Sequence, residues 1–110
     1  MVQSWLRSRN TLEFLKLWEE LNNPNFKFQE YENLLKRIKE GNFTITPKQW
    51  IEKTGATGMV SKQGKNGGTF SHQIIAYEFM MWIFPKYKMI MIQTFDLSEQ
   101  WKRIKEDKRG

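Results

Sequence analysis

A glycine-rich run near the middle of the chain restricts the possible folds more than any other feature. Its sequence is Gly64-Lys65-Asn66-Gly67-Gly68-Thr69-Phe70-Ser71-His72, and it holds three of the seven glycines and the only histidine. Asn66-Gly67 is the dipeptide that best tolerates positive φ at both central positions of a type I′ turn. We therefore predict a short β-hairpin with strands over residues 60–65 and 68–71.

The tip of this hairpin is basic. Between Met59 and His72 the only charged residues are Lys62 and Lys65, and neutral hydrogen-bonding side chains surround them. A small, positively charged hairpin suits a surface that meets phosphate groups. Gly-rich hairpins are common turns, and two lysines on one are often only solvated, so both interpretations stay open from these residues alone.

Length and composition limit the class of protein. The chain has 110 residues, five Trp, eight Phe and three Tyr, but no cysteine. This is enough for one domain with its own core, without disulfides or a cysteine-based zinc site. We expect the domain to cover residues 1–101, followed by a charged, frayed tail over residues 102–110.

The charge balance favours a polyanionic partner. Lys and Arg number 18 against 12 Asp and Glu, which gives a net charge of +6, and the isoelectric point is about 9.7. The longest apolar run, residues 79–85, is too short to cross a bilayer, and no apolar segment follows Arg7 and Arg9 as in a signal peptide. We expect a soluble chain that is not secreted.

Apolar spacing predicts four helices in addition to a short one that directly precedes the hairpin. The first begins at a cap formed by Asn10 and Glu13 and runs to Leu21, after the end of an earlier helix over residues 2–6. Another is expected over residues 27–40. Two more follow the hairpin: residues 72–84, capped by Ser71 and apolar enough to be central, and residues 86–105.

A short helix directly before the hairpin has the clearest start signal in the chain. Thr46 is placed as its N-cap, Pro47 at its first position and Gln49 where a capping box requires it. Gly55 ends it after about two turns. Its outward residues could lie in the major groove of DNA or simply face solvent. The order of helix, tight turn and hairpin predicts a mainly helical α+β domain that resembles a winged helix, with one small β-hairpin.

Catalytic motifs are incomplete. A phosphate-binding P-loop requires Ser or Thr after Gly64-Lys65, where this chain has Asn66, and a glycine at the position of Met59. The single imidazole, His72, has no evident acid to orient it, and we expect it to have a structural role in capping or packing. The aspartates and glutamates are too scattered for a two-metal site. We therefore expect no enzymatic activity, cofactor or metal.

The chain resembles KilA-N domains, the DNA-binding modules of bacteriophages, prophages and large DNA viruses. The resemblance rests on ordered blocks: Trp5-Leu6-Arg7-Ser8, Thr11-Leu12-Glu13-Phe14-Leu15, Trp50-Ile51-Glu52-Lys53-Thr54-Gly55-Ala56-Thr57-Gly58, the glycine-rich run, Ile75-Ala76-Tyr77-Glu78-Phe79 and Trp82-Ile83. It implies a fold related to the fungal APSES domains, with a helix-turn-helix-like unit, a β-hairpin wing and a role in transcription regulation. It also implies a location at the nucleoid in the cytoplasm of a bacterial host.

Carried onto this chain, the resemblance implies a set of wing residues. The family's basic glycine run falls on Gly64, Lys65, Gly67, Gly68 and Thr69, and its histidine falls on His72. Family members usually have Arg or Lys followed by an aromatic or small residue at the position of Lys65-Asn66. Lysine can neutralise a phosphate but cannot form the bidentate guanine contact of arginine.

A second difference from the family lies at the N-terminus. KilA-N domains usually begin with a strand pair and a helix before the position of Trp5, and we expect this chain to lack them. A fragment, a shortened variant or a domain that pairs with another copy would each explain this difference.

Our leading hypothesis is that the chain is a module of phage or prophage origin that binds double-stranded DNA. Residues 47–54 would approach a groove of the DNA, and the hairpin would contact its backbone. The candidate phosphate contacts are Lys48, Lys53, Lys62 and Lys65, the candidate base readers are Gln49, Gln63 and Asn66, and Thr69 lies beside them. The alternative is a protein-interaction or dimerisation module, in which Trp5, Phe95 and Trp101 are partly exposed. A third possibility is a protein that binds single strands or RNA by stacking bases on aromatic side chains. Phe70 is the one aromatic residue in the basic hairpin, and its alternation points it inward as readily as outward.

Overall fold

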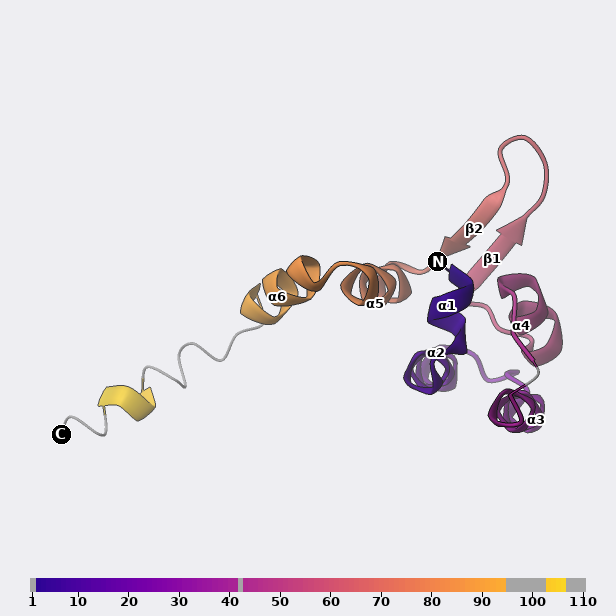
Figure 1. Cartoon of the computed structure of the whole chain (residues 1–110), viewed down its shortest axis with the longest axis horizontal. Coiled ribbons are helices and arrows are strands. Elements are labelled where there is room, and N and C mark those ends of the chain that lie inside the picture. Colours follow the sequence, from indigo (N-terminus) through magenta and orange to yellow (C-terminus); the bar gives the residue numbers. More distant parts are fainter. Residues whose placement is uncertain (1, 42, 95–102, 107–110) are drawn as a thin grey trace. The chain divides into compact units, whose positions relative to one another are not determined.

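The computed structural model describes residues 2–41, 43–94 and 103–106 (Figure 1). Within these ranges the chain is mainly helical and has one two-stranded antiparallel sheet, which confirms the predicted α+β class. It divides into two compact units, Met1–Phe79 and Met80–Gly110. Each unit is therefore described by itself.

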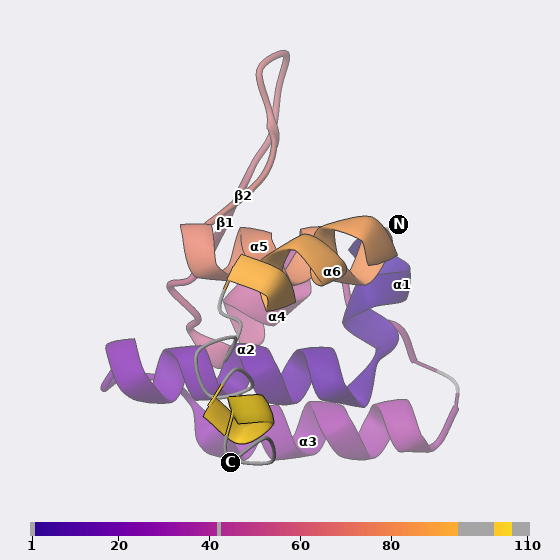
Figure 2. The same ribbon diagram turned by 90° about the vertical axis from the view of Figure 1, so that its left-hand side faces the viewer.

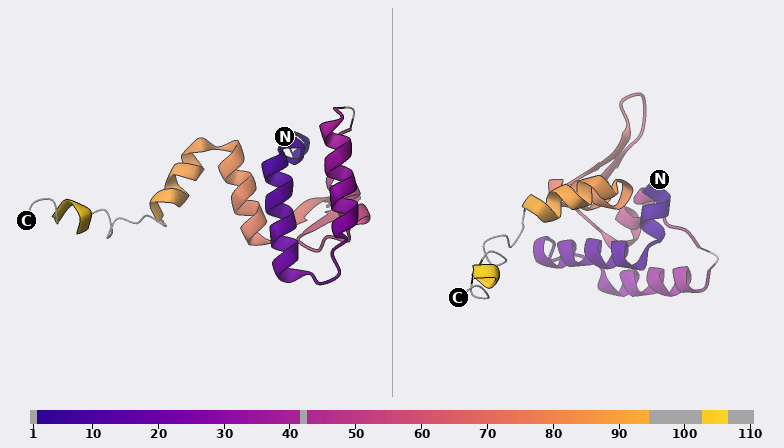
Figure 3. Two further views of the ribbon diagram at one scale, coloured as in Figure 1. Left: turned by 90° about the horizontal axis from the view of Figure 1, so that it is seen from below. Right: turned by 60° about the vertical axis from the view of Figure 1, so that its left-hand side comes forward.

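Four helices build most of the first unit: α1 (Val2–Arg7), α2 (Arg9–Asn22), α3 (Phe28–Lys39) and α4 (Pro47–Thr54). Helix α1 packs on α2, and both α1 and α3 pack on α4. Figure 2 and Figure 3 show α2 and α3 lying side by side. The four helices agree with the predicted ones to within one or two residues at most ends.

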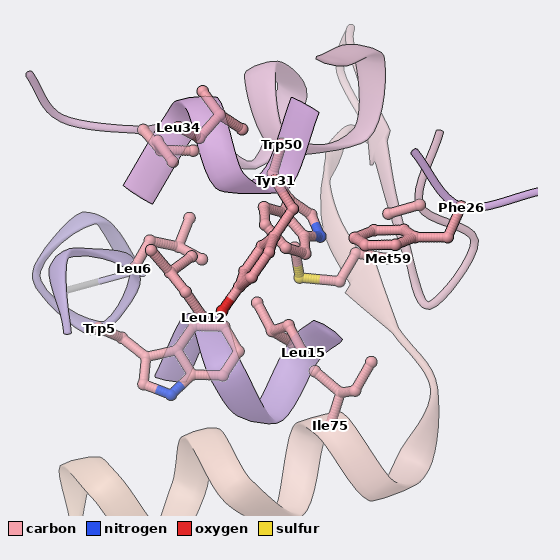
Figure 4. Packing of buried hydrophobic residues seen from close by; sticks show 12 residues of the cluster. Trp5, Leu6, Leu12, Leu15, Phe26, Tyr31, Leu34, Trp50, Met59 and Ile75 are labelled. Atoms are coloured by element: carbon pink, nitrogen blue, oxygen red, sulfur yellow. The ribbon is translucent and has the colours of Figure 1, made fainter. Parts of the chain in front are cut away.

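The core of the first unit joins these helices to the start of the hairpin. Trp50 is 1% exposed, and its ring centroid lies 5.8 Å from that of Phe26 and 6.0 Å from that of Tyr31. Figure 4 shows the side chains packed around it. The buried apolar residues are Trp5, Leu6, Leu12, Leu15, Phe26, Tyr31, Leu34, Ile45, Trp50, Ala56, Met59 and Ile75. Helix α4 is therefore fixed from its inner side by a large aromatic residue.

The predicted cap of α2 is wrong. Helix α2 begins at Arg9 with Ser8 as its N-cap, so Asn10 lies inside the helix, and no side chain caps this end. The cause is the short connection to α1, where the Ser8 amide already donates to the Trp5 carbonyl at 3.2 Å. A chain that enters the second helix directly from the first leaves Asn10 no extended conformation in which to cap.

The hairpin consists of β1 (Met59–Lys62) and β2 (Gly68–Ser71), with Val60 opposite Phe70 and Lys62 opposite Gly68. The predicted two-residue type I′ turn is wrong. Residues 63–67 form the loop, the Gly67 amide donates to the Gly64 carbonyl at 3.0 Å, and positive φ occurs at Gly64 and Gly68 instead. Glycines on both sides of Lys65-Asn66 allow this wider loop without positive φ at a residue that has a side chain.

Helix α5 (Gln73–Ile83) follows the hairpin, and its first half belongs to the first unit. The Trp5 indole donates from Nε1 to Glu78 Oε2 at 2.5 Å, and its ring stacks on Phe79 with centroids 4.9 Å apart. The predicted central position of α5 is wrong, because only Ile75 is buried along it and Trp82 is 43% exposed. An apolar pattern shows that a helix favours burial but does not identify what covers it.

The second unit contains the last residues of α5 and the whole of α6 (Pro85–Thr94). Helix α6 has no buried residue. Residues 103–106 form a further helical turn. The predicted helix over residues 86–105 begins as expected, while Phe95 and Trp101 lie outside the described residues, as does most of the predicted tail. No helix in the described ranges combines the length and hydropathy needed to cross a bilayer.

Candidate nucleic-acid interface

Helix α4 is held by signals at both ends. The Gln49 amide donates to Thr46 Oγ1 at 3.1 Å, and the Thr46 amide donates to Gln49 Oε1 at 3.0 Å, which confirms the predicted capping box. Pro47 occupies the first helical position, and Gly55 ends the helix with φ of 70°. These local bonds stabilise an eight-residue helix that would be marginal in isolation.

The outer side of α4 is basic. Lys48 and Lys53 are exposed, as is Glu52, whereas Trp50 points into the core. Together with Lys62 and Lys65 on the hairpin, these lysines give residues 47–72 four cations against one acid. Each lysine therefore stands where it could neutralise a phosphate with little competition from nearby carboxylates.

The hairpin projects from the helices of the first unit, as Figure 2 shows. Every residue from Val60 to Ile74 is exposed. The loop is closely packed at Gly67, where an added Cβ would lie 2.4 Å from the Lys62 carbonyl oxygen. The glycine thus holds Lys65 and Asn66 at the tip of a compact loop.

A buried carboxylate anchors the start of the hairpin to α2. Glu19, 1% exposed, accepts from the Thr57 amide at 2.8 Å and from the Gly58 amide at 2.7 Å. It also accepts from Thr57 Oγ1 and from Asn23 Nδ2. Four donors satisfy a charge that would otherwise be costly to bury, and they fix the direction in which β1 leaves α4.

The other end of the hairpin is fixed nearby. The His72 amide donates to the Gly58 carbonyl at 2.8 Å, and the His72 ring lies 5.2 Å from that of Trp18. An added Cβ at Gly58 would come within 2.9 Å of both Trp18 and Glu19 and within 2.5 Å of Ile75. Only glycine allows α2, the hairpin and α5 to approach this closely.

The prediction that Ser71 caps α5 is wrong, because His72 occupies the N-cap position. Because β2 extends through Ser71, the N-cap of α5 falls on His72, and its Nδ1 accepts from the Ile74 amide at 3.2 Å. The Ser71 hydroxyl donates to the His72 carbonyl instead.

A hollow of about 420 Å³ lies beside α4 and the start of the hairpin. It is lined by Ile51, Ala56, Met59 and Val60, with Lys48, Glu52, Thr57 and Ser61 completing it. Strand β1 packs directly against α4. Of the predicted contact residues, Lys48 lines this hollow, whereas those of the hairpin do not.

The predicted polar residues differ in their freedom to bind. The Gln49 oxygen is engaged in the capping box, so only its amide NH₂ group remains for a base. Lys62 Nζ lies 5.7 Å from the Phe70 ring centroid. Gln63, Asn66 and Thr69 are exposed on the hairpin.

Glu19 was missed by sequence reasoning. Its signal was nevertheless present, since it follows Leu12 by seven residues and Leu15 by four, which places it on the buried side of α2. An acid at such a position indicates a set of donors that only the folded chain brings together.

These features define a class: a small, mainly helical protein with exposed lysines on a short helix and on a hairpin whose first strand packs against that helix. The particular family is shown by comparison, because the sequence profile of the KilA-N domain matches residues 1–100. The chain belongs to the KilA-N domain family, which is a family of DNA-binding domains and not of enzymes.

The chain is also similar to Protein kilA of Escherichia phage P1. The two are 39% identical over 56 residues, which cover 47% of this chain and 21% of that protein. The chain therefore spans about a fifth of the length of this curated relative. No solved structure matches it. Together the family and this relative support a phage-type DNA-binding regulatory domain.

Proposed function

We propose that this chain is a non-enzymatic module that binds double-stranded DNA through α4 and the hairpin, as a winged helix does. Helix α4 enters the major groove, and the hairpin contacts the phosphate backbone beside it. Transcription regulation at the host nucleoid, in a phage or prophage setting, is the role that this activity would serve.

One observation carries the proposal: an exposed basic helix and an exposed basic hairpin are packed together and held from behind by one buried carboxylate. Lys48 and Lys53 extend from α4, and Lys62 and Lys65 from the hairpin. Rigid attachment matters because phosphate contacts fix the register and orientation of a protein on the duplex. The bonds from Glu19 to Thr57 and Gly58 supply that rigidity.

Fluorescence anisotropy with a labelled duplex and its single strand, across a salt series, tests the proposal. If four to six phosphates are engaged, log K should fall with log salt at a slope of about −4 to −5, and the duplex should bind more tightly than the single strand. A chain shown by circular dichroism to be folded, yet unable to bind duplex at low salt, would contradict the proposal.

Exposed apolar residues in the second unit favour a second candidate function, which is self-association. In α6, Tyr87, Met89, Ile90 and Ile92 are all about half exposed or more. A helix that is apolar on several sides usually packs against a partner. Sedimentation equilibrium measures this directly: a concentration-dependent dimer favours the second function, and a monomer at high micromolar concentration contradicts it.

A further inference from the structure

One face of the hairpin carries an apolar pair that phosphate binding does not use. Val60 and Phe70 are cross-strand neighbours in the antiparallel ladder, so their side chains lie on the same face. Val60 is 47% exposed and Phe70 is 50% exposed. An exposed aromatic next to an exposed valine is unusual on a projecting hairpin, where polar residues normally face water.

A cation accompanies this pair on the same face. Lys62 is two residues from Val60 and therefore points to the same side of β1, and its Nζ lies 5.7 Å from the Phe70 ring centroid. Proteins that bind the minor groove combine basic side chains with apolar wedges, and this face of the hairpin carries both kinds of residue.

Groove dimensions limit where this face can bind. If α4 occupies the major groove, the hairpin that leaves its end meets the adjoining backbone and minor groove. The minor groove of B-DNA is about 6 Å wide, which is too narrow for a two-stranded ribbon. Entry of the hairpin therefore requires the groove to open, and apolar side chains that insert between base pairs produce such opening.

We propose that Phe70 is a wedge that inserts partly between base pairs from the minor groove, with Val60 packed against the sugars and Lys62 on the phosphate. This inference rests on the proposed function. It predicts binding preference for pyrimidine–purine steps, which unstack most easily. It also predicts that Phe70, rather than the lysines, controls the deformation of the duplex.

Duplexes that carry 2-aminopurine next to TpA steps test the wedge, because the fluorescence of this base rises when it is unstacked. Saturating amounts of the chain should raise the fluorescence. Phe70→Ala should abolish the rise and weaken duplex binding by about tenfold. Phe70→Leu should retain most of the rise, because leucine also acts as a wedge, although it loses the ring that Lys62 contacts.

Lys65→Ala is the matched control. It should weaken binding and flatten the salt slope, yet leave the fluorescence rise at saturation unchanged. Equal fluorescence for Phe70→Ala and the unchanged chain, both bound to duplex and folded by circular dichroism, would overturn the wedge alone. Loss of the rise in both Phe70 variants would also overturn it. Absence of any duplex binding by the unchanged chain would overturn the proposed function and the wedge together.

Discussion

Glu19 shows how one side chain can determine the geometry of a binding surface from behind it. Its two carboxylate oxygens accept from Asn23, directly after α2, and from the segment between α4 and β1. The same carboxylate lies within 2.9 Å of the position that a Cβ at Gly58 would take. The hydrogen bonds of Glu19 and the lack of room for a side chain at Gly58 therefore both favour one arrangement of α2 and the hairpin.

Glu19→Gln should lower the free energy of unfolding by about 1–3 kcal/mol, because one accepting oxygen becomes a donor that faces another donor. Urea denaturation followed by tryptophan fluorescence measures this change. Glu20→Gln, on the exposed side of the same helix, is the matched control and should stay within about 0.5 kcal/mol. Equal stability of the two variants would mean that the buried carboxylate does not anchor the hairpin.

Tyr31 provides a pH-dependent prediction. Burial raises the pKa of its hydroxyl above the usual 10.0, Glu13 and Glu32 raise it further, and Arg9 lowers it. The folded chain therefore holds this proton more tightly than the unfolded chain does. Stability from this source is complete below about pH 10 and is lost as the pH rises through the folded pKa.

Unfolding free energies measured from pH 8 to pH 11 test this sign. Tyr31→Phe should show a shallower decline above about pH 10 than the unchanged chain. Tyr87→Phe, which alters a half-exposed tyrosine on α6, serves as the control and should decline as steeply as the unchanged chain. A steeper decline in Tyr31→Phe would contradict the assigned direction.

Among the helices and strands, those with start signals inside a single turn were predicted well, whereas features that depend on contacts between elements were not. The start of α4 was predicted to the residue because Thr46, Pro47 and Gln49 act within one turn. The hairpin was predicted but its loop was wrong, since three glycines allow several turn geometries and Asn66-Gly67 is only one of them.

The candidate site was predictable in composition but not in geometry. The cations of α4 and the hairpin are evident in the sequence, whereas the engagement of the Gln49 oxygen in a cap, the exposure of Phe70 and the role of Glu19 depend on how elements meet. Burial was the least predictable property. The apolar pattern of α5 gave no means of knowing that Trp82 would be 43% exposed.

Gly67→Ala should open the hairpin loop, because the added Cβ would lie 2.4 Å from the Lys62 carbonyl oxygen. Hydrogen–deuterium exchange of the amides of β1 and β2 should accelerate, while exchange in α2 and α3 stays unchanged, since the loop lies outside the core. Ser61→Ala, on the same hairpin, is the control for an ordinary loss of a polar side chain. Unchanged exchange in Gly67→Ala would contradict the described loop.

The first unit of the molecule combines a helical core with exposed lysines, four of which lie on α4 and the hairpin. The net charge of +6 alone would attract DNA to many parts of the chain. The proposed interface is more specific, because four lysines of α4 and the hairpin contact phosphates and those of α3 do not. This difference separates a defined interface from general electrostatic attraction.

The most direct test compares the salt dependence of duplex binding in Lys65→Ala and Lys39→Ala, which remove the same charge from the hairpin and from the exposed end of α3. Lys65→Ala should flatten the slope of log K against log salt by about one unit, while Lys39→Ala should leave the slope unchanged. Equal slopes for both variants and the unchanged chain would exclude the hairpin from the interface and contradict the proposed function.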